Sequence, residues 1–141
     1  KTFFDEANHV TILLERMWLM DCLFCKIAQK EVDSKILYED EKYLAFLDID
    51  QSDAEGHTLI IPKKHFEDYT ELDQETLYEM FAIARKLVPF LMERLNKKAC
   101  TLLFNYKDSQ KVKHVHLHIL PDFQFGPRSK SQEEIYELLK D

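Results

Sequence analysis

The sequence predicts an α+β domain in which helices pack on an antiparallel β-sheet. Apolar and β-branched residues fall in short segments with a period of two at 35–62 and 100–120, which is typical of strands. After Asp73, apolar residues instead recur every three or four positions over a long segment, which indicates a helix. The first strands are joined by links of hairpin length, and hairpins make neighbouring strands antiparallel.

Length and composition fit one globular domain. The chain has 141 residues, of which 45% are hydrophobic and 32% are charged. We expect a single domain over residues 21–141, preceded by an N-terminal extension at residues 1–20. Helical spacing of the apolar residues in this extension predicts an additional amphipathic helix. These residues are Phe3, Phe4, Ala7, Val10, Leu13, Leu14 and Met17.

Five strands are expected. Residues 35–39 and 43–49 form a hairpin whose turn spans 39–42, and residues 56–62 form a third strand that Pro62 closes. The remaining two strands, 100–106 and 113–120, follow the long helix. The predicted order is therefore β-β-β-α-β-β-α.

Two helices are expected in the domain itself. Asp73 is a good N-cap for the first, and Pro89 should kink it. Its predicted buried face consists of Leu77, Phe81, Ala84, Val88, Leu91 and Leu95. Ser131 and Glu134 form a capping box for a C-terminal helix that runs to about Lys140 and packs on the sheet.

Charge and glycine content exclude several functions. The formal net charge of −7, from 26 acidic and 19 basic residues, argues against binding to nucleic-acid polymers, although a single nucleotide could still bind. The only glycines are Gly56 and Gly126, so a P-loop or a GxGxxG turn is impossible. No apolar run of about 18 residues predicts a membrane span, and the N-terminus lacks the basic region of a secretory signal.

Three histidines alternate in "KHVHLHILP", residues 113–121. On a strand, His114, His116 and His118 would share one face, while Val115, Leu117 and Ile119 would share the core face. Three imidazoles in strict alternation next to a core face indicate a functional site rather than a chance pattern. Two functions fit at this point: a metal cluster, because histidine is a common metal ligand, or nucleophilic catalysis by a neutral imidazole.

The cysteines suggest a metal or redox role. Cys22 and Cys25 form a CxxC motif, and Cys100 is predicted to be a small buried residue. An odd number of cysteines is more typical of a reducing compartment than of a disulfide framework, so we expect a cytoplasmic protein. A tetrahedral zinc site needs two further ligands, and because no second CxxC exists, the histidines are the candidates.

Four motifs together resemble those of the histidine triad (HIT) superfamily. They are "CLFCKI" at 22–27, "FLDI" at 46–49, "GHTLIIPKKH" at 56–65 and "SQKVKHVHLHILP" at 109–121. They occur in the order and at about the spacing that the family uses, and the resemblance covers residues 22–123. It implies a nucleotide-binding hydrolase or transferase that acts at the α-phosphorus of a nucleoside phosphate derivative, such as a purine nucleoside phosphoramidate or a dinucleoside polyphosphate.

The resemblance also implies roles for individual residues. His116 corresponds to the nucleophile that forms a nucleotidyl-histidine, His118 to a donor that contacts the α-phosphate, and His57 to the fourth histidine near the triad. Asp48 corresponds to the acid that binds the ribose hydroxyls. Asn105 and Gln110 correspond to polar residues of the family that approach the phosphate.

In the CxxC-bearing branch of the family, a structural zinc ion is implied, with ligands corresponding to Cys22, Cys25, His65 and His114. If His114 binds zinc, it does not also contact the substrate. The resemblance further implies a homodimer, joined through sheet edges or through the long helix.

The loop before the triad departs from the family pattern. Most members carry a glycine-rich Gly-Gln-Ser/Thr-Val stretch there, whereas residues 105–112 contain no glycine and Lys111 replaces the Ser/Thr. A lysine at this position could neutralise phosphate charge or point into solvent. This difference bears on the choice of substrate, because the Ser/Thr helps to protonate the leaving group.

Two other functions compete with that of a HIT-type hydrolase. The first is a non-catalytic nucleotide-binding zinc protein of the same fold, which would not need both His116 and His118. The second is a metal-dependent hydrolase that uses the triad as ligands. The second is disfavoured because Leu120 and Pro121, rather than an acidic residue, follow the triad.

Overall fold

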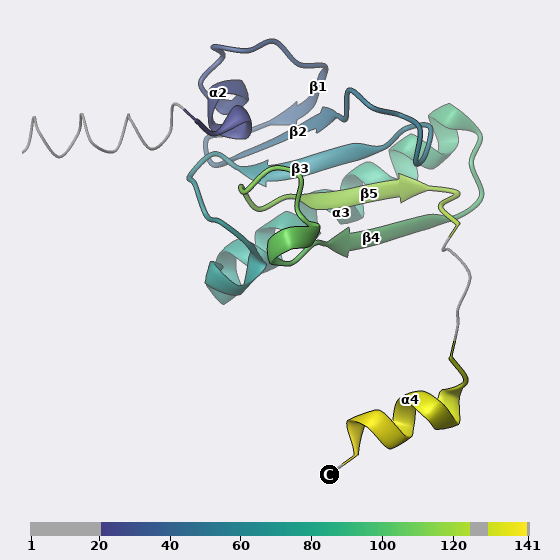
Figure 1. Cartoon of the computed structure of the whole chain (residues 1–141). Helices are drawn as coiled ribbons and strands as arrows, with labels where there is room; N and C mark the ends of the chain where they lie inside the picture. Colours follow the sequence, from purple (N-terminus) through teal and green to yellow (C-terminus); the bar gives the residue numbers. More distant parts are fainter. Residues whose placement is uncertain (1–20, 125–129, 141) are drawn as a thin grey trace, which may run out of the picture.

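The computed structural model describes residues 21–124 and 130–140. A five-stranded sheet with the order β1-β2-β3-β5-β4 forms its centre, and every neighbouring pair is antiparallel (Figure 1). The predicted α+β class is therefore confirmed, whereas the helix predicted over residues 1–20 lies outside the described residues. The strands are β1 Ile36–Glu39, β2 Tyr43–Leu47, β3 Thr58–Pro62, β4 Cys100–Phe104 and β5 Leu117–Pro121.

The two faces of the sheet bury different helices. On one face lies α3, Gln74–Leu95, over a core that includes Ile60 and Leu117. On the other face lies the short helix α2, Leu23–Ala28, over a second core that includes Phe46 and Leu59. Because side chains alternate along a strand, each central strand contributes to both cores.

Helix α3 begins as the sequence predicts. The Asp73 carboxylate accepts a hydrogen bond from the backbone N–H of Thr76 at 2.8 Å, and the helix ends at Asn96, which has a left-handed backbone conformation. The helix continues through Pro89 without a break.

The predicted buried face of α3 is partly wrong. Ala84 and Leu91 are buried, but Phe81 and Leu95 are about 40% exposed. The helix presents a neighbouring stripe to the sheet, formed by Met80, Ile83, Ala84, Leu87 and Leu91. Apolar residues cover a wide sector of this helix, so that periodicity alone cannot tell which part of the sector faces the sheet.

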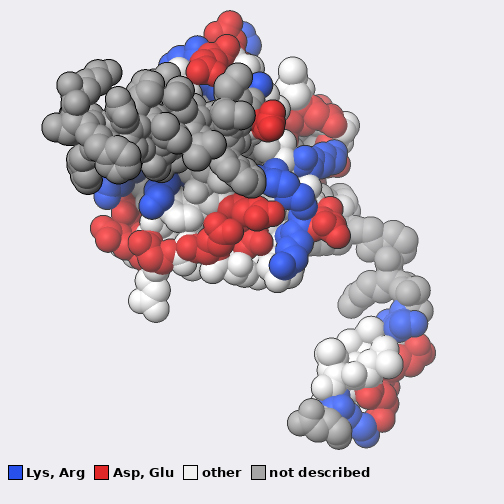
Figure 2. Space-filling model, turned by 60° about the vertical axis from the view of Figure 1, so that its left-hand side comes forward, with Lys and Arg blue, Asp and Glu red and all other residues white. Residues whose placement is uncertain are grey.

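The C-terminal helix α4, Gln132–Leu139, forms with the predicted cap, in which the Ser131 hydroxyl accepts from the N–H of Glu134 at 3.2 Å. It is not packed on the sheet as the sequence predicts, because none of its residues is buried and it lies away from the sheet (Figure 1). Figure 2 shows its uncharged side chains gathered on one side and acidic ones on the other. Among the described residues, no helix has the length and hydropathy to cross a membrane.

Candidate active site and metal centre

The histidines lie on the face of the sheet that carries α2. Leu117 and Ile119 of β5 are anchored in the core beneath α3, so His118 between them projects from the opposite face. The hydrogen-bonded strand begins only at Leu117, and His114 and His116 precede it. The alternation nevertheless continues, because the rings of His116 and His118 lie 4.6 Å apart and Phe24 of α2 contacts the rings of both His114 and His116.

His116 is held in one tautomer. Its Nδ1 lies 2.7 Å from the backbone carbonyl oxygen of His114, which can only accept, so Nδ1 carries the proton. The lone pair is therefore on Nε2. Burial lowers the pKa of His116, so that the ring is neutral at pH 7. Phe24 packs edge-on against the ring at 5.0 Å and fixes its plane. A neutral, oriented imidazole of this kind is a competent nucleophile.

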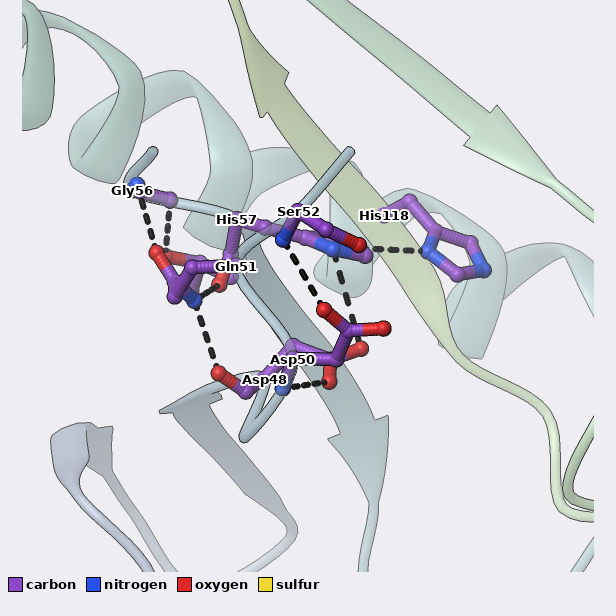
Figure 3. A network of polar contacts seen from close by, with 8 residues as sticks. Asp48, Asp50, Gln51, Ser52, Gly56, His57 and His118 are labelled. Atoms are coloured by element: carbon purple, nitrogen blue, oxygen red, sulfur yellow. Dashed lines mark hydrogen bonds and ion pairs between the residues drawn. The ribbon is translucent and has the colours of Figure 1, made fainter. Parts of the chain in front are cut away.

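His57 and His118 form a pair connected to Asp48 (Figure 3). His57 Nε2 lies 2.8 Å from His118 Nδ1, and His57 Nδ1 lies 3.6 Å from Asp48 Oδ2. The Nε2 atom of His118 is buried and has no partner. If His57 donates from Nε2 to His118, then His118 must carry its own proton on Nε2, where it can donate to a ligand. In a neutral His57 ring this arrangement leaves Nδ1, the atom that faces the Asp48 carboxylate, without a proton. A proton on His57 Nδ1 would instead make Nε2 the acceptor of a bond from His118 Nδ1.

His118 is strongly biased towards the neutral form. Its pKa is lowered to about 3, chiefly by burial and further by the positive charges that His116, His57 and Lys111 contribute. A neutral His118 carries one N–H, so it donates either from Nδ1 to His57 or from Nε2 to a ligand. Which of the two it does depends on whether His57 Nε2 accepts or donates.

The loop that carries Asp48 and His57 is internally braced (Figure 3). The Gln51 amide nitrogen donates to the carbonyl oxygens of Asp48 at 2.7 Å and His57 at 3.0 Å, and its oxygen accepts from the N–H of Gly56 at 2.7 Å. The Asp48 Oδ1 atom accepts from the N–H of Asp50 at 2.9 Å. These contacts fix the Asp48 carboxylate at the end of β2, close to His57.

The residues predicted to approach the phosphate lie in the loop between β4 and β5. Gln110 is buried, and its amide nitrogen donates to the Glu67 carbonyl oxygen at 2.9 Å, while its oxygen has no partner. Asn105 is half-buried directly after β4. Gln110 thus anchors this loop, and its free oxygen is suited to accept rather than donate a hydrogen bond.

The four predicted metal ligands converge. The donor atoms of Cys22, Cys25, His65 and His114 all lie within 4.8 Å of one another. His114 Nδ1 lies 3.3 Å from both sulfurs and 3.2 Å from His65 Nδ1. In a tetrahedral site with metal bonds of about 2.3 Å to sulfur and about 2.0 Å to nitrogen, neighbouring donors lie about 3.3–3.8 Å apart. The four residues therefore fit a metal ion.

The tautomer of His114 also fits a metal ion. Its Nε2 donates to the carbonyl oxygen of Pro62 at 2.8 Å, so the lone pair of Nδ1 points into the cluster. Burial lowers the pKa of His114 to about 4, and burial followed by the neighbouring Cys22 raises the pKa of the Cys25 thiol to about 12. A bound cation reverses the second effect, because it favours the thiolate.

Sequence patterns alone did not identify three residues of the site. Phe24 lies between the two cysteines and contacts the nucleophile candidate, and Gln51 braces the Asp48 loop. Ile49 follows Asp48 and is fully exposed, which is unusual for a large aliphatic side chain. The sequence predicts Ile49 at the end of a strand, whereas in the structure β2 ends at Leu47.

Comparisons with known proteins find one matching family model and similar chains. The family model described as "HIT domain" matches residues 29–125. An uncharacterised HIT-like protein of Methanocaldococcus jannaschii is 39% identical over 105 residues, which cover 73% of this chain and 80% of that protein.

Two solved structures share the fold at similar identity. One is a hypothetical histidine triad nucleotide-binding protein from Sulfolobus tokodaii, with a TM-score of 0.68 and 37% identity over 84% of this chain and 86% of that one. The other is a HIT family hydrolase from Legionella pneumophila, with a TM-score of 0.65 and 39% identity over 74% of this chain and 95% of that one.

Proposed function

The chain belongs to the HIT domain family, and we propose that it is a nucleotide-binding hydrolase that acts at the α-phosphorus of a nucleoside phosphate derivative. The observation that carries this proposal is the single tautomer of His116. With Nδ1 bonded to the His114 carbonyl oxygen, Nε2 holds a lone pair on the α2 side of the sheet. Two similar proteins support this proposal. The Sulfolobus tokodaii protein is described as nucleotide-binding, and the Legionella pneumophila protein is described as a hydrolase.

The proposed reaction has two steps. His116 Nε2 forms a bond to the α-phosphorus, the bond from phosphorus to the leaving group breaks, and the electron pair departs with that group. Water then attacks the nucleotidyl-histidine, releases the nucleoside monophosphate and restores the imidazole. His118 donates from Nε2 to a non-bridging phosphate oxygen, and His57 donates from Nε2 to His118 Nδ1, which keeps the proton of His118 on Nε2.

Nucleoside recognition is proposed at the end of β2. The Asp48 carboxylate is braced and partly exposed, so it can accept hydrogen bonds from ribose hydroxyls. The exposed Ile49 side chain next to it offers an apolar surface for a purine base. Asn105 is proposed on the phosphate side of the site, and Gln110 supports that side by holding the loop through its bond to the Glu67 carbonyl oxygen.

The metal centre is proposed to bind structural zinc. A set of two sulfur and two nitrogen donors in tetrahedral arrangement suits Zn²⁺, and four protein ligands leave no open position for water. Zinc would hold α2, and therefore Phe24, against His116. Cysteine ligands of this kind persist in a reducing compartment, which supports a cytoplasmic location.

We further propose that the protein is a homodimer joined at β4. This strand is one edge of the sheet, its residues 100–104 carry no charge, and Leu102 is 38% exposed. An apolar hollow between β4 and α3 continues the surface, with Tyr78, Phe81, Val88, Pro89, Cys100 and Leu102 in its lining. An uncharged edge strand beside an apolar surface is suited to pairing with a second copy.

The proposal is tested by replacing His116 with asparagine. Turnover of adenosine phosphoramidate and of diadenosine tetraphosphate should fall by about 10³-fold or more, because no other group supplies the nucleophile. Wild-type protein quenched in alkaline denaturant during turnover should carry adenylate on His116, detected by peptide mass spectrometry. Circular dichroism and AMP binding should be unchanged in the variant.

Two results would contradict the proposal in different ways. Full turnover in His116→Asn would exclude the nucleotidyl-histidine. If the wild-type protein binds AMP but turns over neither substrate, the chain is a non-catalytic nucleotide-binding protein of the same fold.

A further inference from the structure

The loop that joins β2 to β3 holds a candidate site residue at each end. Asp48 directly follows β2, His57 directly precedes β3, and the N–H of Asp48 donates to the His57 carbonyl oxygen at 2.9 Å. The residues in between, 49–56, form neither strand nor helix. Beyond that one backbone bond, the separation of the two ends depends on contacts made within the loop.

The side chain of Gln51 bonds to both ends of this loop (Figure 3). Its amide nitrogen donates to the carbonyl oxygens of Asp48 at 2.7 Å and of His57 at 3.0 Å, and its amide oxygen accepts from the N–H of Gly56 at 2.7 Å. These partners determine the orientation of the amide, because a carbonyl oxygen can only accept and a backbone N–H can only donate. One planar group thus fixes three backbone groups relative to one another.

The two ends that Gln51 joins serve different parts of the site. The Asp48 side chain is 24% exposed, so its carboxylate is open to a ligand, and its Oδ2 lies 3.6 Å from His57 Nδ1. The His57 side chain is 4% exposed, and its Nε2 lies 2.8 Å from His118 Nδ1. Because Gln51 bonds to the backbone of both residues, it sets the position of the proposed ribose acceptor relative to the histidine pair.

We propose that Gln51 is a positioning residue that couples recognition of the ribose to alignment of the α-phosphorus. This inference rests on the proposed function, in which Asp48 accepts from the ribose hydroxyls and His118 contacts the phosphate. Gln51 does not touch the nucleotide and acts through Asp48 and His57.

The physical reason is that a rigid frame makes two contacts of one ligand interdependent. When the Asp48 carboxylate and the histidine pair are held at a fixed separation, a ribose bound at Asp48 places the α-phosphorus at a defined distance from His116 Nε2. The interaction of the ribose hydroxyls then helps to align the reacting atoms, so it increases kcat as well as affinity. Without the Gln51 contacts, Asp48 moves independently of His57 and this alignment is lost.

The test compares Gln51→Met with the matched control Asp50→Ala. Methionine fills a similar volume but makes none of the three hydrogen bonds. The Asp50 carboxylate accepts from the N–H of Ser52 at 2.9 Å, a contact in the same loop that involves neither of its ends. Both variants therefore remove side-chain contacts to the loop backbone, but only Gln51→Met removes the connection between the two ends.

The kinetic measurement uses adenosine phosphoramidate and its 2′,3′-dideoxy analogue. In the wild-type protein and in Asp50→Ala, loss of the two hydroxyls should lower kcat by about tenfold or more. In Gln51→Met, kcat for the ribose substrate should already be about 10- to 100-fold lower, and it should fall by a larger factor than KM rises. Loss of the hydroxyls should then change kcat of this variant by less than about threefold.

A binding measurement separates this inference from the proposed function. Calorimetry with AMP and with 2′,3′-dideoxyadenosine monophosphate gives the preference for the ribose hydroxyls, whether or not the protein is an enzyme. Gln51→Met should lower this preference by about tenfold, the usual effect of losing a charged hydrogen bond. Asp50→Ala should keep the wild-type preference, because loss of its charge affects both ligands equally.

The possible outcomes point to different conclusions. An unchanged preference in Gln51→Met, or an equal loss in Asp50→Ala, would overturn the role of Gln51 and leave the proposed function in place. A wild-type protein that shows the preference but no turnover would overturn the proposed hydrolysis, and the binding comparison would still decide the role of Gln51. A wild-type protein without the preference would overturn ribose recognition at Asp48 and, with it, the coupling.

Discussion

At the scale of single residues, the three histidines of residues 114–118 differ in the partner of Nδ1. In His114 this atom faces the metal ligands, in His116 it donates to a backbone carbonyl, and in His118 it contacts His57. The spacing in the sequence predicts that the three side chains lie on one side of the sheet. It cannot predict the ring orientations, because these depend on Pro62 and His57, which are distant in the sequence.

The low pKa of His118 predicts a pH-dependent stability. The native state binds a proton on His118 only near pH 3, whereas an unfolded histidine binds one near pH 6.5. Between these values the unfolded state binds more protons, so the free energy of unfolding should fall as the pH is lowered from about 6.5 towards 3. One such group contributes at most about 1.4 kcal/mol per pH unit.

Replacing His118 with asparagine should therefore flatten this dependence. The difference in the free energy of unfolding between pH 7 and pH 5, measured by urea denaturation, should be smaller in His118→Asn than in the wild-type protein. The urea m-values should match, which shows that both proteins expose the same surface on unfolding. An unchanged difference between the two pH values would contradict the low pKa of His118.

At the scale of elements, α2 connects the metal centre to the nucleophile. The helix has six residues, too few to be stable alone, and the Cys22 sulfur caps it by accepting from the N–H of Cys25 at 3.3 Å. Its Phe24 contacts His116, and His114 supplies both a metal ligand and the carbonyl that orients His116. Loss of the proposed metal should thus disturb the candidate catalytic residues.

Removing the metal should lower both stability and kcat. Treatment with a strong chelator should lower the melting temperature by about 5 °C or more, because the ligands then lose a cross-link between α2, β3 and the His114 segment. The kcat should fall more than KM rises, because the orientation of His116 is disturbed while the Asp48 side of the site is not. Differential scanning fluorimetry and steady-state kinetics measure the two effects.

Cysteine variants provide a matched control for this experiment. Cys25→Ser should contain little zinc by elemental analysis, whereas Cys100→Ser, which changes a cysteine outside the cluster, should keep the wild-type zinc content. Retention of one zinc per chain in Cys25→Ser, or an unchanged melting temperature after chelation, would contradict a structural zinc site.

The helices show where prediction from sequence succeeds and where it fails. The caps Asp73 and Ser131 are local signals, and both make the predicted hydrogen bonds. The buried face of α3 and the packing of α4 depend on tertiary contacts instead. Ile135, Tyr136, Leu138 and Leu139 of α4 are all exposed in the single chain, although the amphipathic pattern of the helix predicts a buried face.

At the scale of the whole molecule, the sheet separates the larger apolar core from the candidate site. Most of the apolar core lies beneath α3, whereas the metal cluster, the nucleophile and the braced Asp48 loop lie on the α2 side. The family resemblance implies this grouping, and the structure shows that antiparallel pairing brings β3 and β5 together. The resemblance does not predict which edge of the sheet is available to a partner.

The two edges of the sheet differ in the regularity of their pairing and in their charge. At β1 the register shifts between Ile36 and Tyr38, and Glu39 forms ion pairs with Lys30 and Lys63 at 2.7 and 2.8 Å. Irregular pairing and charge protect an edge against further strands. The other edge, β4, pairs with β5 without a shift and carries no charged residue. We therefore expect the partner subunit at β4.

Leu102→Glu should convert the dimer to a monomer, because it places a charge at the centre of the β4 edge. Light scattering coupled to size-exclusion chromatography should show one chain per particle, and the melting temperature should lose its dependence on protein concentration. The matched control is Leu37→Glu on β1, since Leu37 and Leu102 are exposed to the same extent, 37% and 38%. That variant should remain a dimer. If Leu37→Glu dissociates the protein and Leu102→Glu does not, the interface lies at the β1 edge and the charges around Glu39 contribute to it instead of protecting it.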